Sequence, residues 1–294
     1  MRILITGKKG QVGKCLVEQL NRLPEITFLA LDRAELDITN EVQVNRVVGE
    51  FKPNVIINAA AYTAVDKAES EINLAYAVNR DGPKFLAEAA ERNSALILHI
   101  STDYVFSGNK KGTYSEADTT ALQGVYGASK LAGEQAVINA CSRHIILRTA
   151  WVFGEHGNNF VKTMLRLAQT RDVLGVVGDQ FGGPTYAGDI ASALIVMAKA
   201  IFDGENDKFG IYHFSGLPHV SWSEFAHSIF EKAVEQGVLK SSPTVNAIST
   251  AEYPTPAKRP VNSKLATTLI KDQFGIDASD WKAALQNIKA YTNI

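Results

Sequence analysis

A glycine-rich turn near the start of the chain constrains the fold more than any other feature of the sequence. Residues 3–5 form a short apolar run, the turn carries Gly7, Gly10 and Gly13, and apolar residues then recur at helical spacing over residues 12–20. A strand that passes through a glycine turn into an amphipathic helix is typical of the first unit of a parallel α/β sheet. We therefore expect the chain to begin with such a unit.

The alternation of apolar runs and helical patterns continues through the first half of the chain. The runs are rich in β-branched residues and lie at 3–5, 28–31, 55–57, 96–100 and 145–147. Short, continuous apolar runs are typical of parallel strands that are covered on both faces. A helical pattern at 85–90 follows Gly82 and Pro83, and proline suits a first helical turn. This order predicts an α/β fold with a doubly wound parallel sheet of Rossmann type.

After about residue 150 the loops become longer and richer in glycine and proline. Helical patterns persist at 160–168, 189–201, 222–236 and 281–291. We expect residues 1–150 to form a dinucleotide-binding domain and residues 151–294 to form mainly a smaller C-terminal substrate-binding lobe. Part of 174–202 is expected to return to the first domain.

The composition excludes several classes of protein. The 294 residues include 30 basic and 31 acidic side chains and carry a formal charge of −1, so nucleic acid and anionic membranes are not expected partners. The longest apolar stretch, 190–202, is too short to span a bilayer. Cys15 and Cys141 form no disulfide framework, and neither they nor the histidines show metal-ligand spacing. We expect a cytoplasmic protein without a metal site.

An acidic residue favours a dinucleotide-binding role for the glycine turn. Glycines let the backbone approach a pyrophosphate, which the N–H groups of the following helix can bind. Asp32 ends the second apolar run, nineteen positions after Gly13, where a partner for the ribose hydroxyls is expected. A glycine turn followed by a turn-capping aspartate is the alternative. Arg33 could pair with a 2′-phosphate, so NADH and NADPH both stay open.

Tyr126 and Lys130 could form an acid–base pair. Of the nine tyrosines, only Tyr126 has a lysine four positions later, and on a helix this spacing puts both side chains on one face. A tyrosine hydroxyl has a pKa near 10, and a nearby ammonium group favours its anion. A core tyrosine followed by a surface lysine explains the pair equally well by itself.

Hydroxyl groups follow the fourth apolar run, where a parallel sheet binds its ligands. Ser101, Thr102 and Asp103 come directly after residues 96–100. Ligands bind outside the carboxyl ends of parallel strands, so Thr102 could donate a hydrogen bond to a substrate carbonyl while Tyr126 supplies the proton. A hydroxyl that caps the following turn is the alternative.

These motifs together resemble the extended short-chain dehydrogenase/reductase family. The shared motifs are the three glycines, residues 58–61, residues 101–106, and Tyr126 with Lys130. Within this family, residues 10–13, 61–69, 148–153 and 259–265 are similar to the dTDP-4-dehydrorhamnose reductases. The resemblance runs nearly end to end. It implies an NADPH- or NADH-dependent oxidoreductase that reduces the 4-keto group of dTDP-4-dehydro-L-rhamnose to dTDP-L-rhamnose.

The resemblance also implies roles for individual residues. Tyr126 would be the proton donor, Lys130 would hold the nicotinamide ribose and bias the Tyr126 pKa, and Thr102 would position the sugar carbonyl. The substrate, a dTDP-linked 4-keto-6-deoxy sugar, would be bound by Thr102, Asp103 and Trp151. The cofactor would be bound by Tyr126 and Lys130 together with Gly7, Gly10, Gln11, Val12, Gly13, Asp32, Asp37, Ile38, Ala61, Tyr62 and Thr63.

Two residues of the second half of the chain, Trp151 and Arg259, each allow a functional and a structural interpretation. Trp151 follows an apolar run and could instead fill the core. Arg259 could present its guanidinium to the diphosphate of the substrate, or it could be a solvated loop arginine.

Two departures from related patterns narrow the prediction. Sugar-nucleotide dehydratases carry Asp-Glu after the threonine, and the pair here is Asp103-Tyr104, so dehydration is disfavoured. Some family members form a dimer bridged by Mg²⁺ through acidic residues, one of them early in the first helix. Lys14 and Cys15 occupy that stretch, with Glu18 a turn later. A magnesium-linked dimer is therefore not expected, and monomer and homodimer both stay open.

Three other functions fit the same sequence features. Another sugar-nucleotide reductase, or a sugar-nucleotide 4-epimerase that retains its cofactor, would use the same tyrosine and lysine. A regulatory subunit of methionine adenosyltransferase resembles the reductase fold and is not a catalyst. The presence of Thr102, Tyr126 and Lys130 favours an enzyme.

Overall fold

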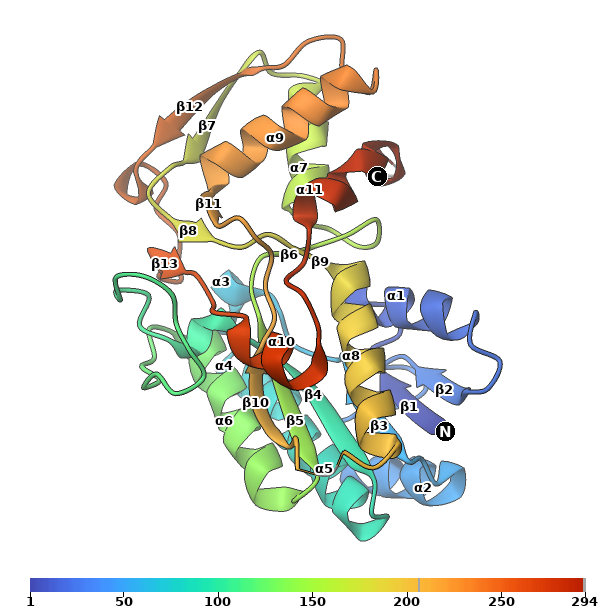
Figure 1. The fold of residues 1–294 in the computed structure, drawn as a ribbon. Helices are drawn as coiled ribbons and strands as arrows, with labels where there is room; N and C mark the ends of the chain where they lie inside the picture. Colours follow the sequence, from blue (N-terminus) through green and yellow to red (C-terminus); the bar gives the residue numbers. More distant parts are fainter. Residues whose placement is uncertain (206, 293–294) are drawn as a thin grey trace.

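A computed structural model describes residues 1–205 and 207–292 and is built on a six-stranded parallel sheet (Figure 1). The strand order is β10-β5-β4-β3-β1-β2. The strands are β1 (Arg2–Thr6), β2 (Thr27–Leu31), β3 (Val55–Asn58), β4 (Leu96–Thr102), β5 (His144–Thr149) and β10 (Gly210–His213). Each apolar run of the first half is a strand, so the predicted doubly wound parallel sheet is confirmed. The strand order reverses at β1, which is where such sheets bind ligands.

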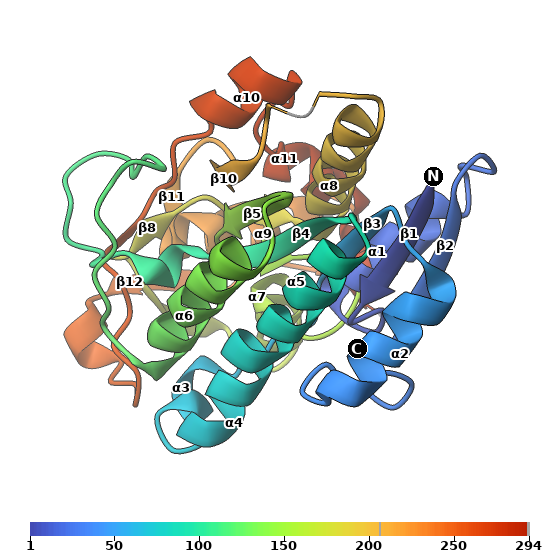
Figure 2. The same cartoon turned by 90° about the horizontal axis from the view of Figure 1, so that it is seen from below.

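Helices cover both faces of the sheet (Figure 2). On one face lie α1 (Gln11–Leu20) and α8 (Ala187–Phe202), packed against Ile3 and Ile5. On the other lie α2 (Glu41–Phe51), α5 (Gly82–Arg92) and α6 (Val125–Ala140), packed against Leu4. Ile3 and Ile5 face one set of helices and Leu4 faces the other, because successive side chains of a strand point to opposite faces of the sheet.

A continuous series of helices leads into α5. It runs from α4 (Ile72–Tyr76) through a π-helical turn, Ala77–Asp81, into α5, and the short α3 (Val65–Ala68) comes before it. Pro83 lies in the first turn of α5, as predicted. The π-helical turn was not predicted, and such turns often occur at functional sites.

The second half of the chain forms a smaller lobe above the carboxyl edge of the sheet (Figure 1). Its helices are α7 (Phe160–Ala168), α9 (Trp222–Glu235) and α11 (Trp281–Ala284). Its strands pair as β7 (Val173–Val177) with β12 (Thr244–Ile248), β8 (Phe181–Gly182) with β11 (Val220–Ser221) and β13 (Asn262–Ser263), and β6 (Val152–Phe153) with β9 (Thr185–Tyr186). Two later elements besides β10, namely α8 and α10 (Thr268–Phe274), pack with the large sheet. The domain division at residue 150 stays a proposal.

The helical pattern over residues 281–291 is confirmed, but two types of helix share this segment. Helix α11 ends at Ala284, and a 3₁₀ helix, Leu285–Thr292, follows it with a kink at Asn287. The buried side chains of this segment are Leu285, Ile288 and Tyr291. A spacing of three residues places side chains on one face of a 3₁₀ helix, which has three residues per turn, whereas an α-helix would spread them.

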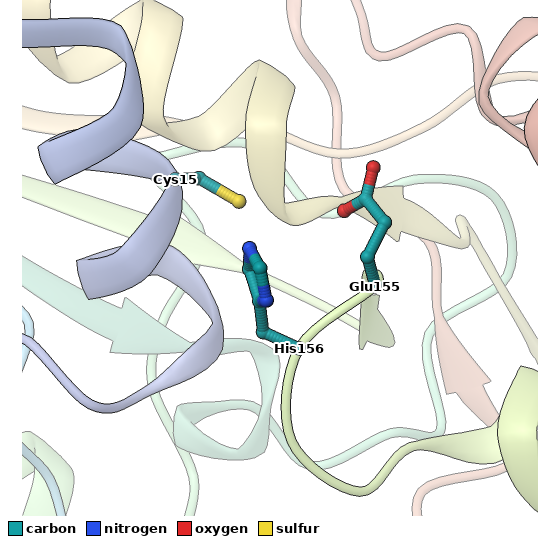
Figure 3. A group of neighbouring side chains, drawn as sticks. All are labelled: Cys15, Glu155 and His156. Atoms are coloured by element: carbon teal, nitrogen blue, oxygen red, sulfur yellow. The ribbon is translucent and has the colours of Figure 1, made fainter. Parts of the chain in front are cut away.

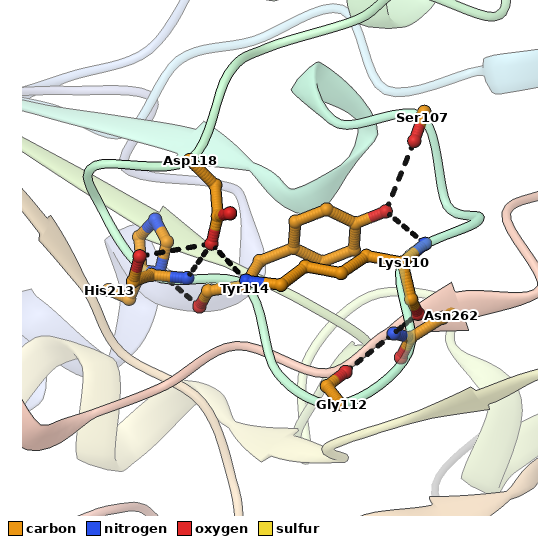
Figure 4. A network of polar contacts seen from close by, with 8 residues as sticks. Ser107, Lys110, Gly112, Tyr114, Asp118, His213 and Asn262 are labelled. Atoms are coloured by element: carbon orange, nitrogen blue, oxygen red, sulfur yellow. Dashed lines mark hydrogen bonds and ion pairs between the residues drawn. The ribbon is translucent and has the colours of Figure 1, made fainter.

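A loop between β4 and α6 is tied to the second half of the chain by polar contacts (Figure 4). Within the loop, the backbone N–H of Lys110 donates to the Tyr114 hydroxyl over 3.0 Å, and Lys110 Nζ pairs with Asp118 at 2.6 Å. From β13, Asn262 Nδ2 donates to the carbonyl oxygens of Lys110 and Gly112, each over 2.7 Å. These contacts hold β13 against this loop.

The described residues contain no helix with the length and apolar character that crossing a lipid bilayer requires. The most apolar of the long helices, α8, is instead buried against the large sheet through Ile190, Leu194 and Met197. Its hydrophobicity thus reflects its place in the core.

A buried ion pair joins α6 to the sheet. Arg148 of β5 and Glu134 of α6 are 2% and 1% exposed, and Arg148 Nη2 lies 2.6 Å from Glu134 Oε2. Arg148 Nε donates to the other carboxylate oxygen over 2.9 Å, and Ser101 of β4 donates to the same oxygen. The two parallel contacts give the pair a fixed geometry.

Loss of Arg148 is expected to cost far more stability than loss of a surface lysine. Arg148→Met leaves the Glu134 carboxylate buried without a counter-charge, so the free energy of unfolding should fall by about 3–5 kcal/mol. Lys84→Met breaks an exposed pair with Glu88 at 3.7 Å and should change it by less than about 0.5 kcal/mol. Urea unfolding measures both, and equal losses would contradict the role given to the buried pair.

Candidate active site

The turn between β1 and α1 has no room for side chains at its glycines. Gly7 has φ +77°, a conformation that favours glycine, and a Cβ there would lie 2.7 Å from the backbone nitrogen of Ala60. A Cβ on Gly13 would lie 2.1 Å from the carbonyl oxygen of Gly7. Helix α1 begins after Gly10 with no side-chain cap, so its first N–H groups remain free to bind an anion.

A cleft of ≈ 710 Å³ opens beside this turn. Of the residues predicted to bind a cofactor, those that line the cleft are Gly7, Gly10, Asp32, Asp37, Ile38, Ala61 and Tyr62. The other predicted cofactor-binding residues, Gln11, Val12, Gly13, Thr63, Tyr126 and Lys130, are not among its lining residues. Val12 is buried in the core, and Gln11 accepts a hydrogen bond from Asn159. Lining residues that the sequence did not suggest include Lys9 and the apolar Leu36, Leu74 and Val78.

Asp32 lies at the edge of the cleft and also caps the turn after β2. Its Oδ1 accepts a hydrogen bond from the N–H of Ala34 over 2.8 Å, and its Oδ2 pairs with Lys9 Nζ at 2.6 Å. The contact with Lys9 holds the pKa of the Asp32 carboxyl below its ordinary value. Asp32 is therefore compatible with both interpretations from the sequence, since it caps the turn and also lines the cleft. Together, the glycine turn, the free helix N-terminus and this carboxylate fit a dinucleotide.

A buried amide side chain fixes one wall of the cleft. Asn79 lies in the π-helical turn, and its side chain accepts from the N–H of Tyr62 over 2.8 Å and donates to the Tyr62 carbonyl over 3.0 Å. The same amide group donates to the hydroxyl of Ser129 on α6 over 3.0 Å. Asn79 thus connects the cofactor cleft with the helix that carries Tyr126 and Lys130. No spacing in the sequence pointed to it.

Tyr126 lies in the first turn of α6, against the end of β4. Its ring packs edge-to-face on Tyr104, with centroids 5.3 Å apart. Burial raises the pKa of Tyr126 to about 12, a hydrogen bond with Thr102 acts in the opposite direction, and the charge of Asp103 adds to the rise. This rise in the Tyr126 pKa is opposite to the lowering that we expected from a nearby Lys130. The hydroxyl keeps its proton at neutral pH, which suits a proton donor.

Lys130 lies one turn after Tyr126 and points into the sheet. Its Nζ donates to the carbonyl oxygen of Ile100 over 2.6 Å and lies 3.5 Å from His99 Nε2. Burial lowers the pKa of Lys130 to about 8, against the opposing charge of Glu134. Because Nζ is directed at β4, Lys130 is not among the groups that shift the Tyr126 pKa within the described residues.

The hydrogen bonds around His99 fix its protonation. Asn58 Oδ1 accepts from the hydroxyl of Thr6 over 2.7 Å and from the N–H of Ala60 over 3.1 Å, so Asn58 Nδ2 must donate to His99 Nδ1, 3.0 Å away. Burial keeps the pKa of His99 well below its ordinary value, so the ring is neutral and carries its proton on Nε2. This N–H faces Lys130, and it favours the neutral amine over the ammonium.

Thr102 and Asp103 are both buried at the end of β4. The Thr102 hydroxyl donates to Asp103 Oδ1 over 3.0 Å and accepts from the N–H of Tyr104 over 3.2 Å. Thr102 therefore caps the turn and also contacts Tyr126. Burial raises the pKa of Asp103 to about 6, although the hydroxyls of Ser263 and Thr102 act against the rise. Ser263 comes from β13 and was not predicted.

A second cleft, of ≈ 440 Å³, lies between the end of β4 and the smaller lobe. Its lining includes Tyr104, Trp151, Trp222, Arg259 and Ser263. Of the three residues predicted to bind the substrate, Trp151 lines this cleft, whereas Thr102 and Asp103 do not. Trp151 stacks on Trp222 with ring centroids 3.5 Å apart, so it forms a wall of this cleft and is only partly buried. Arg259 Nη2 pairs with Asp66 at 2.6 Å, whereas its buried Nη1 has no hydrogen-bond partner among the described residues.

Tyr126 is not among the lining residues of either cleft, but its ring packs on Tyr104. Tyr104 lines the second cleft, and Tyr62, which Asn79 links to α6, lines the first. A protonated phenol beside a threonine hydroxyl can bind a carbonyl oxygen and protonate it. The two cysteines take no part, because burial raises the pKa of both thiols to about 12 and keeps them protonated.

Comparison with known proteins identifies close relatives over the whole chain. The family model described as the RmlD substrate binding domain matches residues 1–293. The dTDP-4-dehydrorhamnose reductase of Aggregatibacter actinomycetemcomitans is 58% identical over 290 residues, which cover 99% of each chain.

Two crystal structures are also similar over nearly their full lengths. A dTDP-4-dehydrorhamnose reductase from Clostridium acetobutylicum superposes with a TM-score of 0.91 at 40% identity, covering 100% of both chains. The Bacillus anthracis dTDP-4-dehydrorhamnose reductase in complex with NADP has a TM-score of 0.90 at 39% identity, covering 98% of both chains.

Replacing Lys130 by an apolar side chain is expected to stabilise the protein. The pKa falls from 10.5 to about 8 on folding, so holding the buried ammonium at pH 7 costs about 3 kcal/mol. Lys130→Met removes this cost and loses one hydrogen bond, for a net gain of about 2 kcal/mol. The penalty is present in full below pH 8 and fades as the pH rises toward 10.5, so the gain should fade too.

Urea unfolding at pH 7 and pH 9.5 measures the effect against the exposed Lys84→Met control. A Lys130→Met protein that is no more stable than the wild type at pH 7 would contradict a strained ammonium. A gain that grows with pH would contradict it as well.

Proposed function

This chain belongs to the RmlD substrate binding domain family of dTDP-4-dehydrorhamnose reductases, and on that premise we propose that it reduces dTDP-4-dehydro-L-rhamnose to dTDP-L-rhamnose, with Tyr126 as the proton donor. It is an NAD(P)-dependent oxidoreductase. The observation that carries the assignment of Tyr126 is its hydrogen bond with Thr102 at the carboxyl end of β4, next to Tyr104, which lines the second cleft.

The proton that the reaction needs comes from Tyr126. When bound, the reduced nicotinamide supplies a hydride to the carbonyl carbon. Thr102 and Tyr126 hydrogen-bond to the carbonyl oxygen, and the phenol hands over its proton as negative charge develops there. Lys130, which lies one turn after Tyr126 on α6, is assigned to the nicotinamide ribose.

The first cleft is proposed to hold the dinucleotide. Gly10, Gln11 and Val12 present backbone at the start of α1, where the free N–H groups suit a pyrophosphate, and Gly7 and Gly13 keep this turn clear of side chains. The adenosine half is then assigned to Asp32, Asp37 and Ile38, and the middle of the cofactor to Ala61, Tyr62 and Thr63. The tie between Tyr62 and Asn79 supports the last assignment.

The second cleft is proposed to hold the sugar nucleotide. The stacked rings of Trp151 and Trp222 offer an aromatic wall to the sugar or the base. The unpaired Nη1 of Arg259 is a buried donor suited to the diphosphate. Asp103, buried beside Thr102, can exchange hydrogen bonds with sugar hydroxyls.

The proposed reaction is tested by NADPH oxidation with the dTDP-linked 4-keto sugar, followed by identification of the product. We expect oxidation to require both compounds and to yield dTDP-L-rhamnose. Cofactor that stays bound without net consumption would indicate a 4-epimerase instead. No reaction with any keto sugar, together with co-purification of a synthetase subunit, would indicate a regulatory protein.

Tyr126→Phe should separate proton donation from binding. The variant keeps the ring and loses the donor, so the turnover number should fall by about 100-fold or more while the Kd for NADPH stays nearly unchanged. Tyr212→Phe, which removes a hydroxyl that donates to the Lys208 carbonyl far from both clefts, is the matched control. Comparable turnover in Tyr126→Phe and the wild type would remove Tyr126 from the reaction.

Asp32→Ala should alter the choice of cofactor. The carboxylate is suited to the ribose hydroxyls and repels a 2′-phosphate, so its loss should raise the Kd for NADH by about tenfold and the Kd for NADPH by less. Glu25→Ala, which breaks an exposed pair with Lys199, should change neither value. Fluorescence titration measures both constants, and equal losses for the two cofactors would count against Asp32 as the ribose ligand.

A further inference from the structure

Three different metal-ligating side chains meet outside the two clefts, between α1 and the loop after β6 (Figure 3). Cys15 comes from α1, and Glu155 and His156 come from the loop. One ligand atom from each residue lies within 4.8 Å of the other two. We propose that Cys15, Glu155 and His156 form a binding site for a divalent transition-metal ion of the zinc type.

The donor set points to this class of metal. A thiol sulfur, an imidazole nitrogen and a carboxylate oxygen are the ligands that Zn²⁺ takes, and three protein ligands leave one position open for water. Mg²⁺ and Ca²⁺ prefer oxygen ligands alone, so the sulfur of Cys15 disfavours them. The three donors surround a space small enough for one ion after a contraction of less than about 1 Å, since Zn–ligand distances are about 2.0–2.3 Å.

The charges of the cluster are unbalanced without a cation. Glu155 Oε2 is buried and has no hydrogen-bond partner among the described residues. The carboxylates of Glu155, Glu18 and Asp189 all act on the thiol of Cys15, a residue that is 4% exposed. A buried carboxylate oxygen without a partner is costly, and a bound cation would satisfy it. The thiol keeps its proton in the metal-free cluster and releases it to solvent when the metal binds.

Two of the three ligands are already oriented by neighbours. The hydroxyl of Tyr186 donates to Glu155 Oε1, which leaves Oε2 for the metal. His156 Nε2 lies 2.9 Å from the carboxylate of Glu18. Supporting hydrogen bonds of this kind are typical of metal-binding histidines and carboxylates.

A metal ion at this site would link helix α1 to the loop after β6. Asn159, in the same loop as Glu155 and His156, donates to Gln11 Oε1 over 3.0 Å and to the Gly154 carbonyl over 2.7 Å. Gln11 directly follows Gly10 of the glycine turn. Joining Cys15 to this loop through an ion would therefore fix the loop and the turn against each other.

Zinc binding by the purified, untagged protein tests the proposal. We expect the wild-type protein to bind about one equivalent of Zn²⁺ with micromolar or tighter affinity in competition with a chromophoric chelator. Substitution with Co²⁺ should give the intense sulfur-to-metal charge-transfer absorption of a thiolate ligand. Cys15→Ser should abolish that absorption, and Tyr186→Phe should weaken Zn²⁺ binding by about 10- to 100-fold.

Cys141→Ser is the matched control, because it removes the other buried thiol and should leave both readouts unchanged. Failure of the wild-type protein to bind Zn²⁺ at micromolar concentration would overturn the proposal. So would a Cys15→Ser protein with wild-type affinity, or loss of the charge-transfer band in Cys141→Ser. If Cys15→Ser does not fold, the presence or absence of that band in the wild-type protein decides. None of these measurements depends on the proposed reduction.

Discussion

The buried polar contacts between α6 and the sheet are the constraint on which the rest of the site depends. Lys130 reaches the carbonyl of Ile100, and Glu134 pairs with Arg148 and accepts from Ser101, so one face of the helix is fixed to β4 and β5. Close backbone approach completes the docking, since a Cβ on Gly133 would lie 1.9 Å from the carbonyl oxygen of Asn79. Tyr126, at the start of the helix, is thereby held against Thr102.

Burial sets the protonation of the candidate catalytic groups in a direction that suits reduction. It raises the pKa of Tyr126 to about 12 and lowers that of Lys130 to about 8, because both charged forms are disfavoured away from water. The neutral ring of His99 adds to the effect on the lysine. Burial makes Tyr126 hold its proton and Lys130 release its proton more readily. The same burial lowers the stability of the fold, as is common at active sites.

Local patterns in the sequence were enough to predict the architecture and the shared helix face of Tyr126 and Lys130. The apolar runs gave the strands, the glycine turn gave the first cleft, and the four-residue step from Tyr126 to Lys130 gave one helix face. Residues whose role depends on a distant partner were not predictable in this way. His99 matters because Asn58 fixes its tautomer, and Cys15 meets Glu155 only after folding. The 3₁₀ geometry of residues 285–292 was not predicted, because the expectation for this segment named a helix without its type.

The most direct test of this account is a crystal structure of the protein with NADP⁺ and dTDP-L-rhamnose. If Tyr126 is the proton donor, the C4 hydroxyl of the sugar lies about 3 Å from both the Tyr126 hydroxyl and the Thr102 hydroxyl, with the dinucleotide in the cleft beside Asp32. A C4 hydroxyl bound elsewhere in the second cleft, out of hydrogen-bonding reach of Tyr126, would contradict it. So would a dinucleotide bound away from the glycine turn.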